Sequence, residues 1–298
     1  MPIKYLSREE LEVAKYNDCI ENSIQRRVYA FSWYLDIVAD NWDVLVLNDY
    51  EAVMPIPWKQ KYFIKYVTQP FFCQQLGVFA RKKISKELVL DFIQNIPNKF
   101  FRISLQLNAE NNIDGEKLVK KNNYVLALNK TSEALIAGFS NNRKRDLKKA
   151  IASSLIIDED ISVKEFFKFY LLNDKFYDKH NFIKNVLENI LQIRNGSLKL
   201  YGIRSNGVLI SCVLLLDDMK RVTYLVPVHN NLSKKNGAMT LLITTIIRKF
   251  QNSDYILDFE GSMVNGVASF YKSFGAEINQ YQQIKYNNLP LLLKLFKR

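Results

Sequence analysis

The amino-acid sequence predicts an α/β fold composed of two similar halves. Amphipathic helical segments alternate with runs rich in β-branched and aromatic residues along the 298 residues. In the second half, three consecutive strand-like runs precede a helix, a strand, a second helix and a last strand. This order joins an antiparallel sheet to a parallel pair through a helical crossover. The first half shows a similar order, which indicates an ancient duplication.

The composition is that of a globular protein with a sizeable hydrophobic core. Hydrophobic residues make up 48% of the chain and charged residues 24%. The formal net charge of +12 favours anionic partners, namely phosphorylated cofactors, nucleic acid or anionic membrane surfaces. A basic surface that follows from a lysine-rich composition explains the charge equally well, so the charge selects no function.

The cysteines and histidines argue against two classes of protein. Cys19, Cys73 and Cys212 are odd in number and form no CxxC pair, unlike a secreted disulfide framework. His180 and His229 belong to no ligand cluster, so no metal is expected. The N-terminus is charged, and no apolar run reaches the length of a membrane span. We therefore expect a soluble, cytoplasmic protein without a stable membrane span.

The first domain is expected at residues 1–139. Its helices are predicted at 17–23, 30–39, 85–96 and 115–121, with Ser85 as the N-cap of the third. Its strands are predicted at 43–47, 52–56, 62–68, 102–107 and 124–128, with a turn at Asn48-Asp49.

The second domain is expected at residues 140–298, because the polar stretch 140–142 is the softest boundary. Its helices are predicted at 143–150, 163–175, 182–193, 238–250 and 267–274. Its strands are predicted at 198–204, 208–216, 221–226, 255–259 and 281–286. Ser205-Asn206-Gly207 predicts a hairpin between the first two strands, and residues 232–237 are polar and loop-like.

The segment that follows the strand at 221–226 has the features of a phosphate site. The predicted loop Ser233–Ala238 leads into a helix, and exposed N–H groups at a helix N-terminus bind phosphates. Lys234 and Lys235 add positive charge. The alternative is an ordinary basic turn in which Gly237 serves the backbone geometry.

One strand later, the segment Asn265–Ala276 carries a second motif, and together the two segments resemble the GNAT acyltransferases. That family has Asn-x-x-Ala and then Tyr-x-x-x-Gly beside its cofactor thiol. Asn265 and Ala268 match the first pattern, and Tyr271 and Gly275 match the second. The loop departs from the family, because Asn236 and Ser233 stand where the family has Gly and Arg or Gln. Asn tolerates left-handed geometry, so the loop can keep its shape.

The resemblance implies a fold, a cofactor and a set of site residues. The fold is two tandem GNAT-like domains, each a mixed antiparallel and parallel sheet flanked by helices. The cofactor is an acyl-CoA, most simply acetyl-CoA, as acyl donor. The residues implied for its binding are Val226, Ser233, Lys234, Lys235, Asn236, Gly237, Ala238 and Asn265. Tyr271 takes the position of the family's general acid; a buried core aromatic is the alternative.

The segment Asp258–Ser262 lies at the end of a predicted strand, where α/β sheets bind ligands. Alternation places Asp258 and Glu260 on one face of the strand. A carboxylate there can deprotonate an incoming ammonium, so Glu260 is the predicted base and Asp258 a predicted substrate contact. The alternative is that both carboxylates cap the following turn or pair with Lys272.

A wider resemblance is to the Fem-like peptidoglycan aminoacyltransferases, which are tandem GNAT folds. It rests on the basic helix Asn142–Ala150, the segment Asp258–Gly261 and the pair Phe274-Gly275. The basic helix can bind phosphates of CoA or tRNA, or it is a solvated helix face. The resemblance covers the last half of the chain well and the first half by architecture.

In the first half, polar amides lie among aromatic residues. Gln74 and Gln75 follow Phe71-Phe72, and with Trp33 and Tyr34 they suit a cleft that orients an acceptor. Inter-domain packing explains the same pattern.

The sequence therefore predicts transfer of an acyl group from acyl-CoA to a small-molecule or peptide amine. The alternatives are a Fem-like enzyme that uses aminoacyl-tRNA, and an inactive GNAT pair that serves as a binding module. No P-loop, GxSxG, HExxH or Rossmann motif is present, which argues against kinases, serine hydrolases, metalloproteases and dehydrogenases.

Overall fold

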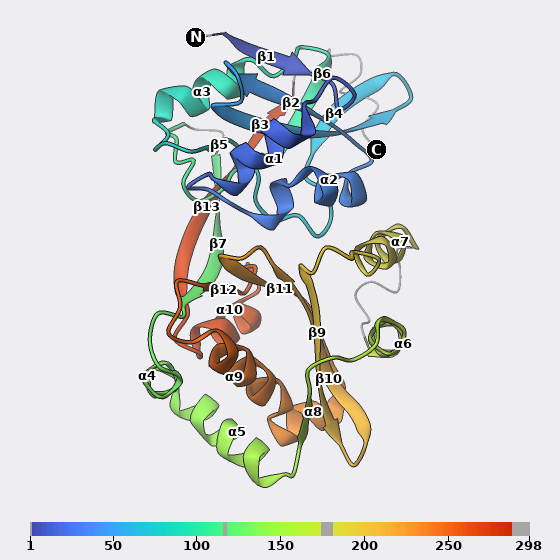
Figure 1. Ribbon diagram of the computed structural model, residues 1–298, viewed down its shortest axis with the longest axis vertical. Helices are drawn as coiled ribbons and strands as arrows, with labels where there is room; N and C mark the ends of the chain where they lie inside the picture. Colours follow the sequence, from blue (N-terminus) through green and yellow to red (C-terminus); the bar gives the residue numbers. More distant parts are fainter. Residues whose placement is uncertain (1, 116–117, 174–180, 288–298) are drawn as a thin grey trace. The chain divides into compact units, whose positions relative to one another are not determined.

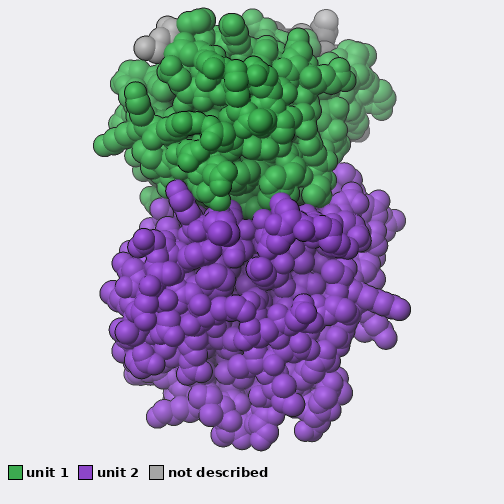
Figure 2. Space-filling model, in the orientation of Figure 1, with its two compact units in different colours: residues 1–121, 280–298 green, residues 122–279 purple. Residues whose placement is uncertain are grey.

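The computed structural model describes residues 2–115, 118–173 and 181–287. The chain forms two compact units, residues 1–121 with 280–298 and residues 122–279 (Figure 2). The division therefore differs from the predicted one at 139/140, and the last strand carries the chain back to unit 1. The predicted boundary at 140–142 is instead the start of a helix, which Ser140 caps by accepting a hydrogen bond from the N–H of Arg143.

Unit 1 contains a mixed sheet in the order β1-β2-β3-β4-β6-β13. Neighbouring strands are antiparallel except β4 and β6, which are parallel. The strands are β1 (Ile3–Leu6), β2 (Asn41–Leu47), β3 (Ala52–Lys61), β4 (Ile64–Thr68), β6 (Phe100–Gln106) and β13 (Glu277–Asn287), and β5 (Phe79–Ala80) pairs with β3. The parallel pair needs a helical crossover, which α3 supplies.

The helices of unit 1 are α1 (Val13–Glu21), η1 (Val28–Ala30), α2 (Ser32–Val38) and α3 (Lys86–Gln94). The predicted N-cap of α3 is confirmed, because the Ser85 hydroxyl accepts a hydrogen bond from the N–H of Leu88. Helix α1 packs onto the sheet through Tyr16, whose ring lies 5.4 Å from that of Trp42 in β2.

The sheet strands of unit 2 follow in the order β7-β12-β11-β10-β9-β8. Strands β11 and β12 are parallel, and the other neighbours are antiparallel. The strands are β7 (Leu118–Ala127, of which residues from 122 belong to unit 2), β8 (Ile156–Asp158), β9 (Leu198–Ser205), β10 (Val208–Asp217), β11 (Arg221–His229) and β12 (Ile256–Asp258). The predicted hairpin is confirmed, with Asn206 and Gly207 both at positive φ between β9 and β10.

The helices of unit 2 are α4 (Ser132–Ala137), α5 (Asn141–Ala152), α6 (Val163–Asn173), α7 (Asn181–Ile190), α8 (Asn231–Asn236), α9 (Ala238–Phe250) and α10 (Asn265–Lys272) (Figure 1). Helix α9 provides the crossover between β11 and β12. Its buried side chains, among them Leu242 and Ile246, join those of β9, β10 and β11 in one hydrophobic core.

Two predicted elements are wrong. The helix predicted at 115–121 overlaps β7, because Val125–Ala127 pair with β12 and extend the strand backwards through residues of weak preference. The loop predicted at 232–237 is mostly helix α8. No described helix is both long and apolar enough to cross a membrane.

Candidate functional site

A pocket of about 590 Å³ opens in unit 2 between strand β11 and helices α5, α8, α9 and α10. All of its lining residues belong to this unit. It begins where β11 ends, which is where an α/β sheet binds ligands at the carboxyl ends of its strands. The pocket has an aromatic wall, a cationic side and a part lined by α8.

The aromatic wall consists of Tyr224 from β11 with Phe270 and Tyr271 from α10. The Tyr271 ring stacks on that of Phe259 at 4.9 Å between centroids and meets the Tyr224 ring edge-on at 6.3 Å. These contacts fix the orientation of Tyr271, which is 8% exposed. Two phenols therefore reach the same pocket.

Tyr224 is the more deeply buried of the two phenols. Its hydroxyl donates to the Sδ atom of Met239 at 2.8 Å. Burial raises the pKa of Tyr224 well above its usual value, and the neighbouring Tyr271 adds to the shift. Tyr224 is therefore a neutral hydroxyl throughout the physiological pH range.

The cationic side of the pocket is centred on Arg143 of α5. Its Nη1 atom donates to Thr240 Oγ1 at 2.9 Å, and its Nη2 atom pairs with Asp146 at 2.8 Å. The guanidinium also lies over the Phe270 ring, 5.0 Å from the centroid. Lys234 of α8 supplies a second positive charge to the lining. Together these groups are suited to binding a phosphate or carboxylate.

Helix α8 occupies the place of the predicted phosphate-binding loop. Asn230 caps it by accepting hydrogen bonds from the N–H groups of Leu232 and Ser233, so these donors are already used. Gly237 ends the helix at φ +68° and begins α9. A Cβ atom there would lie 2.4 Å from the carbonyl oxygen of Asp146, because α5 packs against the junction. The predicted open cradle of backbone N–H groups is therefore replaced by a short capped helix.

Some of the residues predicted to bind the cofactor line the pocket, and the others do not. Ser233, Lys234 and Gly237 line the pocket, and the buried Ser233 hydroxyl is hydrogen-bonded to that of Ser211. The others do not line it: Val226 and Ala238 are buried in the core, Lys235 and Asn265 are exposed, and Asn236 is half-buried.

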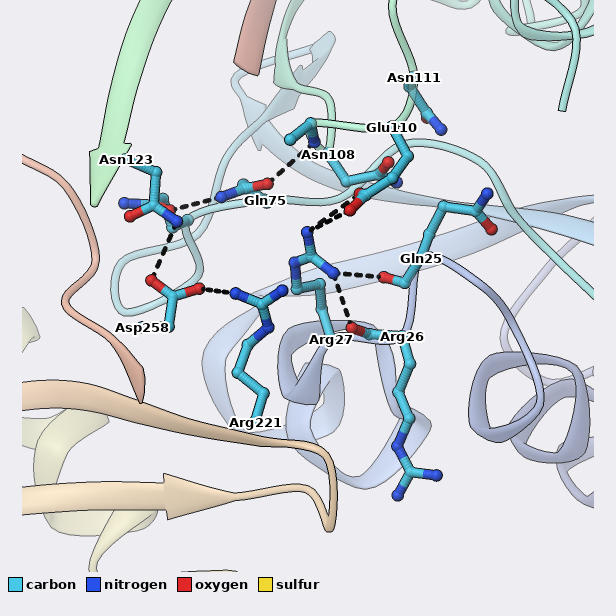
Figure 3. Close-up of polar contacts among 12 residues, drawn as sticks. Gln25, Arg26, Arg27, Gln75, Asn108, Glu110, Asn111, Asn123, Arg221 and Asp258 are labelled. Atoms are coloured by element: carbon cyan, nitrogen blue, oxygen red, sulfur yellow. Dashed lines mark hydrogen bonds and ion pairs between the residues drawn. The ribbon is translucent and has the colours of Figure 1, made fainter. Parts of the chain in front are cut away.

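Asp258 has a structural position that differs from the predicted substrate contact. It is 1% exposed, and its Oδ2 atom pairs with Arg221 Nη1 at 2.6 Å. Its Oδ1 atom accepts a hydrogen bond from Asn123 Nδ2 at 3.0 Å (Figure 3). The same atom accepts a second hydrogen bond from the N–H of Glu260 at 2.9 Å. Because both oxygens are used inside the unit, we assign Asp258 to holding the turn after β12, which is the alternative of a turn cap.

Glu260 lies in that turn with φ +56°, a left-handed conformation that costs a non-glycine residue energy. The next residue, Gly261, packs so closely that a Cβ atom would lie 1.9 Å from the carbonyl oxygen of Asn122. Its N–H donates to Asn123 Oδ1 at 2.7 Å. Glu260 is half-buried and does not line the pocket, so its role as base stays a prediction.

In unit 1, two of the four predicted acceptor residues are buried. Gln75 is 0% exposed and binds within the unit, accepting from the N–H of Ala109 and donating to Gln74 Oε1 (Figure 3). Tyr34 is also 0% exposed, and its hydroxyl donates to the carbonyl oxygen of Phe72. Both are structural residues here, contrary to the predicted cleft, because their polar groups satisfy a buried loop. Trp33 and Gln74 are half-buried.

Sequence reasoning missed Tyr224, His229, Met239 and Thr240 as lining residues of the pocket. Tyr224 and Met239 lie in apolar runs and carry no signal that separates a pocket wall from a core. His229 belongs to no ligand cluster in the sequence, and His180 lies outside the described residues. For the cationic side of the pocket, the sequence does contain a signal, which is the i,i+3 pair Arg143-x-x-Asp146 at the start of a basic helix.

Comparison with known proteins identifies the fold. No family model matches the chain, and no curated protein matches its sequence. FemX has a similar structure, with a TM-score of 0.67 at 11% identity over 99% of this chain and 100% of that chain. A tandem GNAT protein from the clavulanic acid biosynthesis pathway has a TM-score of 0.56 at 9% identity, over 97% and 99%. The fold is the tandem GNAT fold.

A third structure of this kind is the C-terminal domain of a putative lysylphosphatidylglycerol synthetase from Agrobacterium fabrum. It has a TM-score of 0.59 at 10% identity and covers 95% of this chain and 93% of that domain. The prediction of two GNAT-like domains is thus confirmed. The pocket belongs to the second GNAT unit, beside the helix that carries Tyr271.

Proposed function

We propose that this protein is an N-acyltransferase that moves an acyl or aminoacyl group from an activated carrier to an amine. The reaction site is the pocket of unit 2. The observation that carries this proposal is the joint presence of Tyr271, Arg143 and Lys234 around one pocket of the second GNAT unit. A phenol donates a proton to a leaving group, and the cations hold an anionic carrier.

The reaction follows from these groups. The amine nitrogen attacks the carbonyl carbon of the donor, and the bond to the carrier's sulfur or oxygen breaks. The Tyr271 hydroxyl gives its proton to the departing thiolate or alkoxide, since phenols and thiols have comparable basicity. The proton lost by the amine nitrogen passes to a base. Fixed positions of the reactants supply much of the rate enhancement.

Two groups are candidates for the base. Glu260 is the residue predicted from the sequence, and the left-handed backbone holds it in a fixed turn. His229 lines the pocket at the end of β11, where Glu260 does not. Asp146, the other proton acceptor of the pocket, is paired with Arg143. We therefore propose His229 as the base that acts in the pocket and keep Glu260 as the alternative.

The first candidate donor is an acyl-CoA, whose phosphates Arg143 and Lys234 would bind. The second is aminoacyl-tRNA. It is favoured by helix α8, because Asn230 already accepts hydrogen bonds from the N–H of Ser233, the first residue of the predicted pyrophosphate loop, and from the N–H of Leu232 before it. A donor held by side chains, rather than by backbone N–H groups, fits this arrangement.

The test is calorimetric binding of CoA, acetyl-CoA and bulk tRNA to the wild-type protein and to Arg143→Gln, at two salt concentrations. Lys148→Gln is the matched control, because Lys148 is exposed on the same helix and does not line the pocket. Saturable CoA binding that Arg143→Gln weakens supports the acyl-CoA enzyme. Binding of tRNA with a steep salt dependence, and of CoA not at all, supports the second donor. If the protein binds neither, the transferase proposal fails and a binding module remains.

A further inference from the structure

One face of the unit 1 sheet is polar where strands β4, β6 and β13 lie side by side. Tyr66 pairs with Arg102, and Ser104 pairs with Lys285, so these four side chains share a face. The opposite face is apolar and buried, as shown by Val67 at 1% exposure and its register partner Ile103 at 9%.

A pocket of about 520 Å³ lies on these three strands. Hydroxyl and amide groups contribute to its lining together with Arg102 and Lys285, and no carboxylate does. Within the described part of the chain, neither Arg102 nor Lys285 has an ion-pair partner, whereas Lys59 nearby on β3 pairs with Asp40 at 3.0 Å. Two cations without a carboxylate make this pocket complementary to an anion.

Lys121 adds to the positive charge around this sheet face. Its Nζ atom donates to Gln106 Oε1 at 3.3 Å, on the strand that also carries Arg102. Burial lowers the pKa of the Lys121 ammonium, and the positive charge of Lys285 lowers it further. Bound anions would relieve this repulsion between like charges.

The β3–β4 hairpin next to the pocket exposes two large aromatic side chains. Tyr62 is 81% exposed and Phe63 is 76% exposed, at the tip between the two strands. Figure 1 shows this hairpin (light blue) extending away from the body of unit 1. Lys61 and Lys65 flank the tip. Phe63 precedes Tyr66 of the pocket by three residues, which corresponds to about 10 Å along a strand.

Aromatic side chains flanked by lysines are suited to the interface of an anionic membrane. The rings leave water for the boundary between headgroups and acyl chains, while the ammonium groups stay near the phosphates. A soluble partner with a single phosphate would use the pocket and leave the aromatic tip in water. The combination therefore favours a lipid surface.

We propose that unit 1 docks on an anionic lipid surface. A headgroup phosphate occupies the pocket between Arg102 and Lys285, and Tyr62 and Phe63 insert beside it. This docking does not depend on the proposed transferase reaction and brings the whole chain to the membrane surface.

The test is cosedimentation of the full-length protein with vesicles. One set contains phosphatidylcholine alone, and the other contains phosphatidylglycerol as about a third of the lipid. Two double variants remove the proposed contacts: Arg102→Gln with Lys285→Gln, and Tyr62→Ser with Phe63→Ser. The control is Lys82→Gln with Lys83→Gln, which removes the same charge from exposed positions outside the pocket. Circular dichroism confirms that each variant is folded.

We expect wild-type protein to bind the anionic vesicles and not the neutral ones. The Arg102 and Lys285 variant weakens binding on the order of thirtyfold, from about 1 kcal/mol for each cation at an anionic surface. The Tyr62 and Phe63 variant weakens it by about tenfold or more, because apolar area no longer inserts. The control changes it by less than about threefold.

Two results would overturn the proposal. If the control variant loses as much binding as the pocket variant, net charge explains the binding and the pocket has no role. If the wild-type protein does not sediment with the anionic vesicles, unit 1 is no membrane-docking unit. Calorimetric titration with glycerol phosphate then identifies the alternative, because binding that the Arg102 and Lys285 variant loses assigns the pocket to a soluble phosphate.

Discussion

Tyr271 and Tyr224 present two phenols to one pocket, and their surroundings separate their roles. Tyr271 projects from α10, whereas the Tyr224 hydroxyl donates a hydrogen bond to the Sδ atom of Met239. We predict that Tyr271→Phe lowers kcat by about 100-fold, the contribution of a positioned general acid, without changing donor affinity. Tyr224→Phe is the matched control and is expected to change kcat by less than about threefold. Steady-state kinetics on an accepted donor and amine measure both, and equal losses in the two variants would refute the assignment.

The choice of base is also decided by single residues. If His229 takes the proton, His229→Gln removes the acidic limb of the pH profile of kcat/KM, because the ionisable base is gone. Glu260→Gln is then expected to keep that limb and to lower the rate only modestly. The reverse pattern would assign the base to Glu260, as the sequence predicted. The measurement is kcat/KM of each variant across the pH range in which the protein stays folded.

Ionisation of Cys19 is expected to lower the stability of unit 1 at alkaline pH. It is 0% exposed, and burial raises the pKa of its thiol to about 11 from an ordinary value of 9.0. The unfolded chain therefore ionises first as the pH rises, so the stability is fully present below pH 9 and is lost as the pH rises through about 11. At pH 10.5 the loss is about 2 kcal/mol.

Urea unfolding of wild type and Cys19→Ala at neutral pH and at about pH 10.5 measures this effect. The variant is less stable at neutral pH, because a buried side chain is truncated, but it loses less stability on going to alkaline pH. Equal alkaline losses in both proteins would show that Cys19 does not cause the dependence.

At the scale of elements, the junction of α8 and α9 determines the shape of the pocket. Gly237 combines φ +68° with a backbone neighbour 2.4 Å from the position of a Cβ atom. We predict that Gly237→Ala lowers the free energy of unfolding by about 2 to 4 kcal/mol, since strain and overpacking add. It also weakens donor binding, because α5 carries Arg143 and must move away.

Gly207→Ala provides the comparison for that prediction. Gly207 has a similar φ of +77°, and nothing lies within 4 Å of its Cβ position. Its substitution measures the backbone strain alone, about 1 kcal/mol, and leaves donor binding unchanged. If both variants lose the same stability, the close contact with α5 does not constrain the junction.

At the scale of the whole molecule, the two units differ in how the chain forms them. Unit 2 is continuous from residue 122 to 279 and contains its own hydrophobic core. Unit 1 needs residues from 280 onward, because Gln283–Asn287 of β13 pair with β6. We predict that the fragment 122–279 folds alone with cooperative urea unfolding, whereas the fragment 1–121 does not. Cooperative unfolding of the fragment 1–121 would show that β13 is dispensable.

Much of the fold was predictable from local pattern. The order of strands and helices, the Asn206-Gly207 hairpin and the Ser85 cap all follow from preferences within a few neighbouring residues. The Tyr271 motif also placed this residue in the helix that lines the pocket. These features are local, so the sequence alone determined them.

The tertiary structure decided the rest. Whether residues 231–236 form a loop or a helix depends on the Asn230 cap and on α5 packing against Gly237. The sequence predicts Asp258 as a substrate contact. In the structure, Arg221 and Asn123, which are distant in sequence, bind its two carboxylate oxygens. The boundary between the units differs from the predicted one because β13 pairs with β6 of unit 1. Apart from the Asn230 cap, which is a local signal of a helix start, each of these outcomes depends on contacts between residues far apart in the chain, and periodicity and local preference carry no information about such contacts.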